Sequence, residues 1–213
     1  QFHKAIVKVL TSDKLPYLQS TIKNVSYASN ANAHKGDKHA FIIDMENFFT
    51  YKDRELLIIY KQDEKPVPSD FIMHTHDLYE LYYFIGGGGI YRVEGMSYPL
   101  ERGDILIMRP AEAHCIDVNE SKPYTRLSIN FSPELLANID REGRLLRPFN
   151  ERKMGMFNRY RAENFKSDAY RIFLKNITAP CSDRRVQAIT NLLPLLNEIS
   201  EAFESVTETE ADK

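Results

Sequence analysis

The sequence has few cysteines, no tryptophan and no long apolar run. Its two cysteines, Cys115 and Cys181, lie far apart without a C-x-x-C pair, which argues against a disulfide framework or a zinc knuckle. No stretch approaches the roughly 18 to 20 apolar residues that a bilayer-spanning helix needs, and the start of the chain lacks the apolar core of a signal peptide. We therefore expect a cytoplasmic protein with reduced thiols.

An excess of charge of either sign is also missing. The 213 residues carry a formal net charge of −2, so the chain as a whole has no electrostatic footprint for nucleic acid. Its length allows one sizeable domain, or one domain with a helical annex.

Short runs rich in Ile, Phe, Tyr and Val fill residues 39–131, separated by turn sequences such as GGGG, EGMS and ERGD. Such runs predict strands, and the glycines supply the positive φ angles of tight turns. The predicted strands cover residues 40–44, 55–60, 71–76, 79–85, 90–93, 104–108, 114–118 and 124–131. Many short strands without intervening helices predict a mainly β protein with a closed or sandwiched antiparallel sheet. Residues 1–38 carry no motif and are expected to form a leader or an arm.

A helical period replaces the strand period after residue 131. Ser132 and Pro133 predict the start of a helix that ends near Gly143. Further helices are predicted over residues 167–176 and from Ser182 onward, where Pro194 should kink or split the last helix. The helical segment is expected to span residues 132–205, and the acidic residues 206–213 should form a linker or tail.

Two features of this segment leave alternatives open. The last helix has an apolar stripe that packs either within the chain or against a partner; its members are Val186, Ile189, Leu193, Leu196 and Phe203. The basic residues 141–161 could contact phosphate, but such a charge run more often forms a solvated face.

Four residues of the types that bind divalent transition metals recur in the β region. His74, His76 and Glu80 occupy even positions, so an extended chain would point them to one face. His114 follows a turn and an apolar run, where a paired strand could bring it opposite the other three. Three imidazoles and a carboxylate suit one Zn, Ni, Fe, Mn or Cu ion. The alternative is a hydrogen-bonded polar interior without a metal.

Residues on the same even face could line a small-molecule pocket. Tyr82 and Phe84 share the face of the candidate ligands, and Met108 is a further candidate whose face the sequence does not fix. The alternative for all three is ordinary core packing.

The candidate ligands occur in a pattern that resembles the cupin superfamily. His74, His76, Glu80 and Gly87 match its first motif, H-x-H-x3-E-x6-G, and the pair Gly103 and His114 has the spacing of its second. Four non-ligand positions depart from these motifs: Pro68, Pro110, Ala111 and Val118. The resemblance implies a cupin jelly-roll barrel.

A longer set of segments resembles the sensor domain of AraC-type transcription regulators. The segments are HDLYEL (76–81), YRVEG (91–95), YPL (98–100), GDILI (103–107) and LSINFSPE (127–134). The resemblance implies an effector-sensing domain that binds a small molecule in the barrel and forms a homodimer through its C-terminal helices. The family's DNA-reading helix-turn-helix pair is not within these 213 residues, so DNA binding is expected only through a region beyond them.

A metal-dependent cupin enzyme, such as a dioxygenase or a sugar isomerase, is the alternative. The complete set of four candidate ligands favours it, because a catalytic metal needs such a set with open coordination positions. The LSINFSPE segment and the helices after it favour the non-enzymatic regulator.

Overall fold

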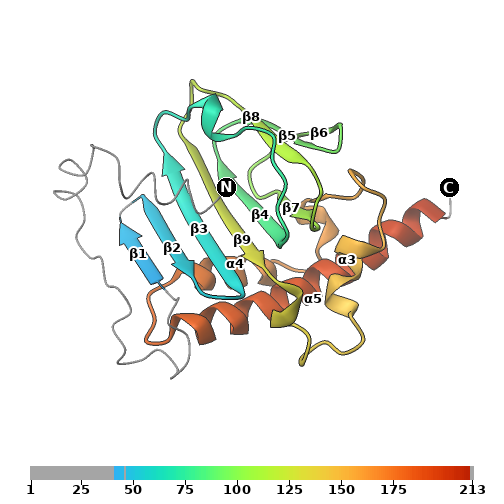
Figure 1. Cartoon of the computed structure of the whole chain (residues 1–213). Coiled ribbons are helices and arrows are strands. Elements are labelled where there is room, and N and C mark those ends of the chain that lie inside the picture. The colour runs from blue at the N-terminus through green and yellow to red at the C-terminus, as the bar shows by residue number, and fades with distance from the viewer. Residues whose placement is uncertain (1–40, 46, 212–213) are drawn as a thin grey trace.

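Two antiparallel sheets and a group of C-terminal helices make up the part of the chain that the structure describes (Figure 1). This computed structural model describes residues 41–45 and 47–211, so the expected leader or arm at residues 1–38 lies outside the described residues. The strands are β1 (Phe41–Met45), β2 (Phe48–Lys52), β3 (Leu56–Asp63), β4 (Tyr79–Gly86), β5 (Gly89–Val93), β6 (Met96–Pro99), β7 (Ile105–Met108), β8 (His114–Val118), β9 (Tyr124–Phe131) and β10 (Arg159–Tyr160). The helices are η1 (Pro68–Asp70), η2 (Pro133–Leu135), η3 (Arg144–Leu146), α3 (Arg147–Asn150), η4 (Ala162–Asn164), α4 (Ala169–Thr178) and α5 (Arg184–Ala211).

The strand order is that of a jelly roll. The large sheet has the order β1-β2-β3-β9-β4-β7-β10, and the small sheet has the order β6-β5-β8. Residues 71–76 extend the small sheet, because His74 and His114 exchange two backbone hydrogen bonds of 3.0 Å. The four strands β3-β9-β4-β7 therefore face residues 71–76, β8, β5 and β6, an eight-stranded double-sheet arrangement. The predicted mainly β jelly roll with a C-terminal helical segment is confirmed.

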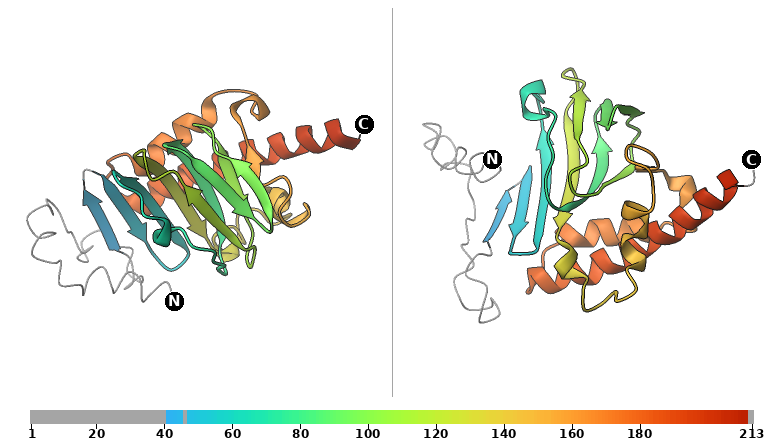
Figure 2. Two further views of the ribbon diagram at one scale, coloured as in Figure 1. Left: turned by 90° about the horizontal axis from the view of Figure 1, so that it is seen from above. Right: turned by 45° about the vertical axis from the view of Figure 1, so that its right-hand side comes forward.

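Side chains of the large sheet alternate between two separate cores. On β4, Tyr82 and Phe84 point toward the small sheet, while Leu81 points the other way. The helices α3, α4 and α5 cover this second face, so β4, β7 and β9 are buried on both sides (Figure 2). The even-numbered residues of β4 and β9 thus share the space between the sheets.

Gly87 allows the tight turn between β4 and β5. Its φ is +115°, and a Cβ added there would lie 2.7 Å from the carbonyl oxygen of Pro123. Only glycine meets both conditions, which explains the glycine that follows the H-x-H-x3-E pattern.

Residues 71–76 are less regular than predicted. The structure has the short helix η1 before them, and only His74 forms a β-bridge. Beside this bridge, the Phe71 oxygen accepts a hydrogen bond of 3.3 Å from the Ile116 amide and the His76 oxygen one of 2.9 Å from the Ala111 amide, so the backbone pairing is discontinuous. The strands β2, β6 and β10 were not predicted.

The predicted helix from Ser132 to Gly143 is wrong. Pro133–Leu135 form a single 3-10 turn, and turns follow it. Gly143 has a left-handed backbone (φ 68°) and instead precedes η3. The predicted helix over residues 167–176 is confirmed as α4, displaced by two residues.

Helix α5 differs from its prediction at both ends and in the middle. Its N-cap is Asp183, whose carboxylate accepts a hydrogen bond of 3.0 Å from the Val186 amide, and not Ser182. Pro194 lies inside one uninterrupted helix, flanked by Leu192 and Leu195, which are buried against the large sheet. The helix also includes residues 206–211, which the sequence assigned to a linker or tail.

The buried face of α5 overlaps only partly with the predicted stripe. Leu196 and Phe203 pack within the chain, which is one of the two alternatives for the stripe, whereas Val186 is 52% exposed. The other buried residues of this face are Ala188, Leu192, Leu195, Ile199 and Ala202. Within the described part of the chain, no helix combines the length and apolarity of a membrane-spanning segment.

Candidate metal centre

The four predicted ligands converge between the two sheets. Glu80 lies on β4 and His114 at the start of β8, while His74 and His76 lie on the segment that leads into β4. The bridge between His74 and His114 places their ring centroids 4.3 Å apart. One ligand atom from each of the four residues lies within 4.8 Å of all the others, which is a geometry that could hold a metal ion.

Backbone carbonyls orient all three imidazoles in the same way. The Nδ1 atom of His74 lies 2.9 Å from the Ile72 oxygen, and that of His114 lies 2.8 Å from the Glu112 oxygen. The Nδ1 atom of His76 makes a contact of 2.9 Å with the Leu78 oxygen. A carbonyl oxygen only accepts, so each Nδ1 is the donor, and in the neutral form of each ring the lone pair is on Nε2. This is the usual outer-shell arrangement of metal-binding histidines.

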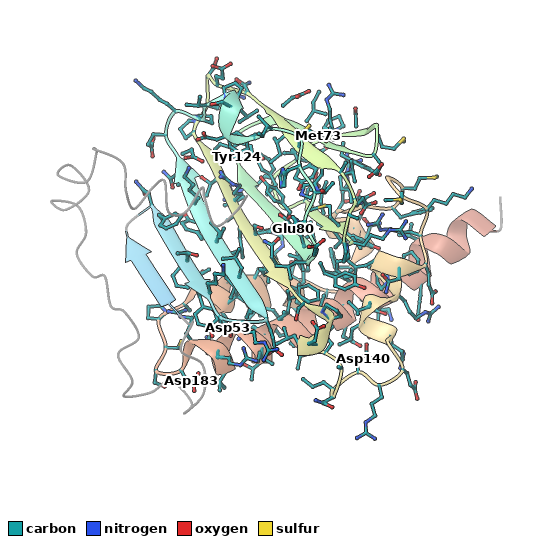
Figure 3. All side chains as sticks on the ribbon, viewed as in Figure 1. Asp53, Met73, Glu80, Tyr124, Asp140 and Asp183 are labelled. Carbon is teal, nitrogen blue, oxygen red and sulfur yellow. The ribbon has the colours of Figure 1, made fainter. Side chains whose placement is uncertain are left out.

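Glu80 is held from the opposite side by two polar residues of β9. Its Oε1 accepts a hydrogen bond of 2.8 Å from the Ser128 hydroxyl, which accepts one of 2.7 Å from the Asn130 amide. Its Oε2 lies 2.8 Å from His76 Nε2 and 3.3 Å from His114 Nε2. Figure 3 labels Glu80 beside β9 and Tyr124 at the other end of that strand.

Ser128 and Asn130 were not predicted as site residues. Their signal was present, because they are polar residues at even positions between the apolar Leu127, Ile129 and Phe131. The register that pairs β4 with β9, which puts Asn130 opposite Glu80, could not be read from the sequence.

The candidate metal centre has one side that is closed to solvent and one side that is open. His114 is 1% exposed and Glu80 is 6% exposed, whereas His74 is open to solvent. His114 Nε2 is fully buried, and its contact of 3.3 Å with Glu80 Oε2 does not have the geometry of a hydrogen bond. A buried lone pair without a partner is costly, and coordination would satisfy it. The donor set and this orphaned atom therefore fit a divalent transition metal, with solvent access beside His74.

The charges of the cluster shift the pKa values of Glu80 and His114 in opposite directions. Burial alone would raise the pKa of Glu80, but the His114 and His76 imidazoles beside its carboxylate outweigh burial and hold that pKa well below its usual range. Burial alone would lower the pKa of His114, but the nearby Glu80 carboxylate raises it. Burial lowers the pKa of His74. The site thus keeps its carboxylate ionised and ready to ligate.

The predicted pocket residues form a wall of the space between the sheets. Tyr82, Phe84 and Met108 are all buried in the core between the sheets, where Tyr82 and Tyr124 share a hydrogen bond of 2.6 Å between their hydroxyls. The ring of Tyr91 stacks on that of His114 with centroids 6.0 Å apart. Core packing accounts for these positions, and a role in ligand binding stays a prediction.

In the basic segment 141–161, Arg152 neither lies on a solvated face nor is available to contact phosphate. Its side chain is fully buried and forms an ion pair of 2.6 Å with Glu112. Sequence reasoning missed this pair, because nothing in a charge run shows which arginine has a buried partner 40 residues away.

One family model matches this chain. It describes the AraC-like ligand binding domain and matches residues 60–193, more than half of the sequence. The chain belongs to this family. The match runs from the second half of β3 through the later strands to the first part of α5, and it confirms the resemblance to AraC-type sensor domains.

Comparisons with other proteins give weaker likenesses. No curated protein sequence matches. Among solved structures, a cupin protein from Bacteroides fragilis is 22% identical with a TM-score of 0.32, covering 38% of this chain and 68% of that one. A Cupin 2 conserved barrel domain protein from Salinispora arenicola is 12% identical with a TM-score of 0.33, covering 42% and 73%. A mutant salicylate 1,2-dioxygenase from Pseudoaminobacter salicylatoxidans is 15% identical with a TM-score of 0.32, covering 40% and 25%.

Metal binding should weaken as the pH falls, because coordination requires neutral imidazoles. The ordinary pKa of histidine is about 6.5. His114 has a raised pKa, so the loss of affinity should begin above that pH. Titration calorimetry with Zn²⁺ at pH 7.5, 6.5 and 5.5 measures the effect. An affinity that stays constant over this range would contradict histidine ligation.

Proposed function

We propose that this chain is the effector-sensing and dimerisation part of an AraC-type transcription regulator. The observation that carries the proposal is the match to the AraC-like ligand binding domain, which covers both the barrel and part of the helical segment. A cytoplasmic location and DNA binding through a region outside this sequence belong to the same proposal. By itself, the chain is then not an enzyme and does not recognise a DNA sequence.

In this proposal the effector binds between the two sheets beside a single divalent metal. His74, His76, Glu80 and His114 would hold a Zn, Ni, Fe or Mn ion, which supplies a Lewis-acidic point for oxygen or nitrogen donors of the effector. The open side at His74 gives such a molecule access, and the buried Tyr82, Phe84 and Met108 would shape its inner boundary.

A metal-dependent enzyme remains the second candidate. The specific observation in its favour is the complete donor set with one side open to solvent, which is also what metal-assisted catalysis needs. A dioxygenase and a sugar isomerase are the two reaction classes that the sequence suggests.

The two candidates predict different fates for a bound molecule. We would add D-glucose, D-xylose, benzoate or salicylate to the metal-loaded protein in air, and follow thermal unfolding and the chemical identity of each compound. For a sensor, at least one compound should raise Tm and be recovered unchanged. A compound present at 100 times its Kd raises the free energy of unfolding by roughly 2.7 kcal/mol. The Tm of a chain of this size shifts by about 2 to 4 °C per kcal/mol.

His114→Ala provides the control, because it removes a ligand from the closed side of the centre and should abolish the metal-dependent part of the stabilisation. Conversion of D-xylose to a ketose, or oxygen-dependent loss of salicylate, would contradict the sensor and favour the enzyme. A panel without any binding would contradict all four compounds as effectors.

We further propose that the C-terminal helices form a homodimer. Val186 on α5 is 52% exposed, and Ile189 and Leu193 follow it at helical spacing and are only partly buried. These three residues form an apolar strip beside the buried face of α5. A second copy of the same strip would cover it in a two-fold symmetric contact.

Replacement of Val186 by Glu should therefore dissociate the dimer, because it places a charge in the apolar contact. The matched control is Ile72→Glu, since Ile72 is also apolar, is 66% exposed and lies in the segment that pairs with β8 of the small sheet, whereas α5 packs on the other face of the large sheet. Sedimentation velocity at micromolar concentration should show dimers for the wild type and the control, and monomers for Val186→Glu. A monomeric wild type, or a dimer that Val186→Glu leaves intact, would contradict the proposed contact.

A further inference from the structure

A buried ion pair joins the helical segment to the loop that precedes His114. Glu112, in the turn between β7 and β8, is 0% exposed, and Arg152, just after α3, is 4% exposed. Two hydrogen bonds connect them side by side, of 2.7 Å from Nη1 to Oε1 and of 2.6 Å from Nη2 to Oε2. Such a bidentate pair fixes the orientation of both side chains as well as their distance.

Other donors lock the Glu112 carboxylate further. Its Oε1 accepts a hydrogen bond of 2.9 Å from the Gly155 amide, and its Oε2 accepts one of 3.1 Å from the Arg109 amide. Arg152 also donates to the Ile107 carbonyl of β7 at 3.2 Å. Desolvation of a buried pair is offset only when its remaining donors and acceptors are satisfied, and most of those here are.

The same glutamate also orients a candidate metal ligand. While its carboxylate binds Arg152, the backbone oxygen of Glu112 accepts a hydrogen bond of 2.8 Å from Nδ1 of His114. The direction of His114 Nε2 therefore depends on where the Glu112 backbone lies. That position depends in turn on the ion pair with Arg152.

The segment around α3 contacts the second ligand strand as well. Tyr79, the neighbour of Glu80 on β4, donates a hydrogen bond of 3.1 Å from its hydroxyl to Asn150 at the end of α3. The rings of Tyr79 and Phe149 meet edge to face with centroids 5.3 Å apart. Residues 147–152 thus touch β4, which supplies Glu80, and the turn before β8, which supplies His114.

On its other side this segment is tied to helix α5. Arg147 of α3 forms an ion pair of 3.1 Å with Glu204, and the carbonyl of Arg144 accepts a hydrogen bond of 3.1 Å from the Ser200 hydroxyl. The segment therefore lies between the candidate metal centre and the longest helix.

We propose that Glu112 and Arg152 are positioning residues that couple the metal centre to the C-terminal helices. Arg152 fixes Glu112, Glu112 fixes the ring of His114, and occupation of the centre stiffens the segment that touches α5. This inference rests on the proposed metal centre, and it adds the route by which that centre acts on the rest of the domain.

The test removes both charges together, because a single buried charge left without its partner is strongly destabilising. The double variant Glu112→Gln/Arg152→Met should fold, bind Co²⁺ about 10 to 100 times more weakly than the wild type, and give an altered visible spectrum of bound Co²⁺. The spectrum reports ligand geometry, which a purely structural role of the pair would leave unchanged. The matched control is Arg92→Met/Asp117→Asn, an exposed pair of 2.6 Å whose acidic member lies on the same strand as His114.

Hydrogen exchange of the wild type tests the reciprocal effect. Co²⁺ loading should slow exchange of the Gly155 amide, the donor to Glu112, by about fivefold or more, because coupling between two sites is reciprocal. The Gln62 amide, which donates a hydrogen bond of 2.8 Å to the Asn47 carbonyl, is the internal reference. Unchanged exchange at Gly155 overturns the inference, even where the double variant fails to fold.

The outcomes separate this inference from the proposed metal centre. A folded double variant with wild-type Co²⁺ affinity and spectrum overturns the role of Glu112 and Arg152, and leaves the centre in place. A wild type that binds no Co²⁺ overturns both.

Discussion

The backbone pairing of His74 with His114 is the contact on which the candidate site depends. Two hydrogen bonds of 3.0 Å attach residues 71–76 to β8, complete the small sheet and bring the H-x-H sequence against the third histidine. Without this bridge the ligand set would divide into two halves on separate segments. The bridge thus serves the fold and the site at once, since it also closes the jelly roll over Glu80.

The two-sided large sheet explains how one domain can combine a buried site with a helical surface. Neighbouring residues of β4 face opposite layers, so Glu80 points to the candidate metal centre while Tyr79 packs against α3. Strands β7 and β9 are shared in the same way between the two cores. One layer of packed strands therefore separates the candidate metal centre from the helices.

Local patterns predicted much of the fold and the ligand set. The strands at residues 114–118 and 124–131 agree with β8 and β9, and the even positions of His74, His76 and Glu80 placed them together. Long-range packing set what the sequence did not show. Burial of Leu192 and Leu195 keeps α5 continuous through Pro194, and a partner on another segment makes Arg152 a core residue. Ser128 and Asn130 became visible only once the register of β9 against β4 was known.

The most direct test of the candidate metal centre is the metal content per chain. It is measured on protein purified without a His-tag or chelator. The wild type should carry about one transition-metal ion per chain, as expected for a single four-ligand site, and His76→Ala should carry almost none while remaining folded. Wild-type protein that is folded and free of metal, even after incubation with Zn²⁺, Ni²⁺, Fe²⁺ and Mn²⁺, would contradict a metal centre at these four residues.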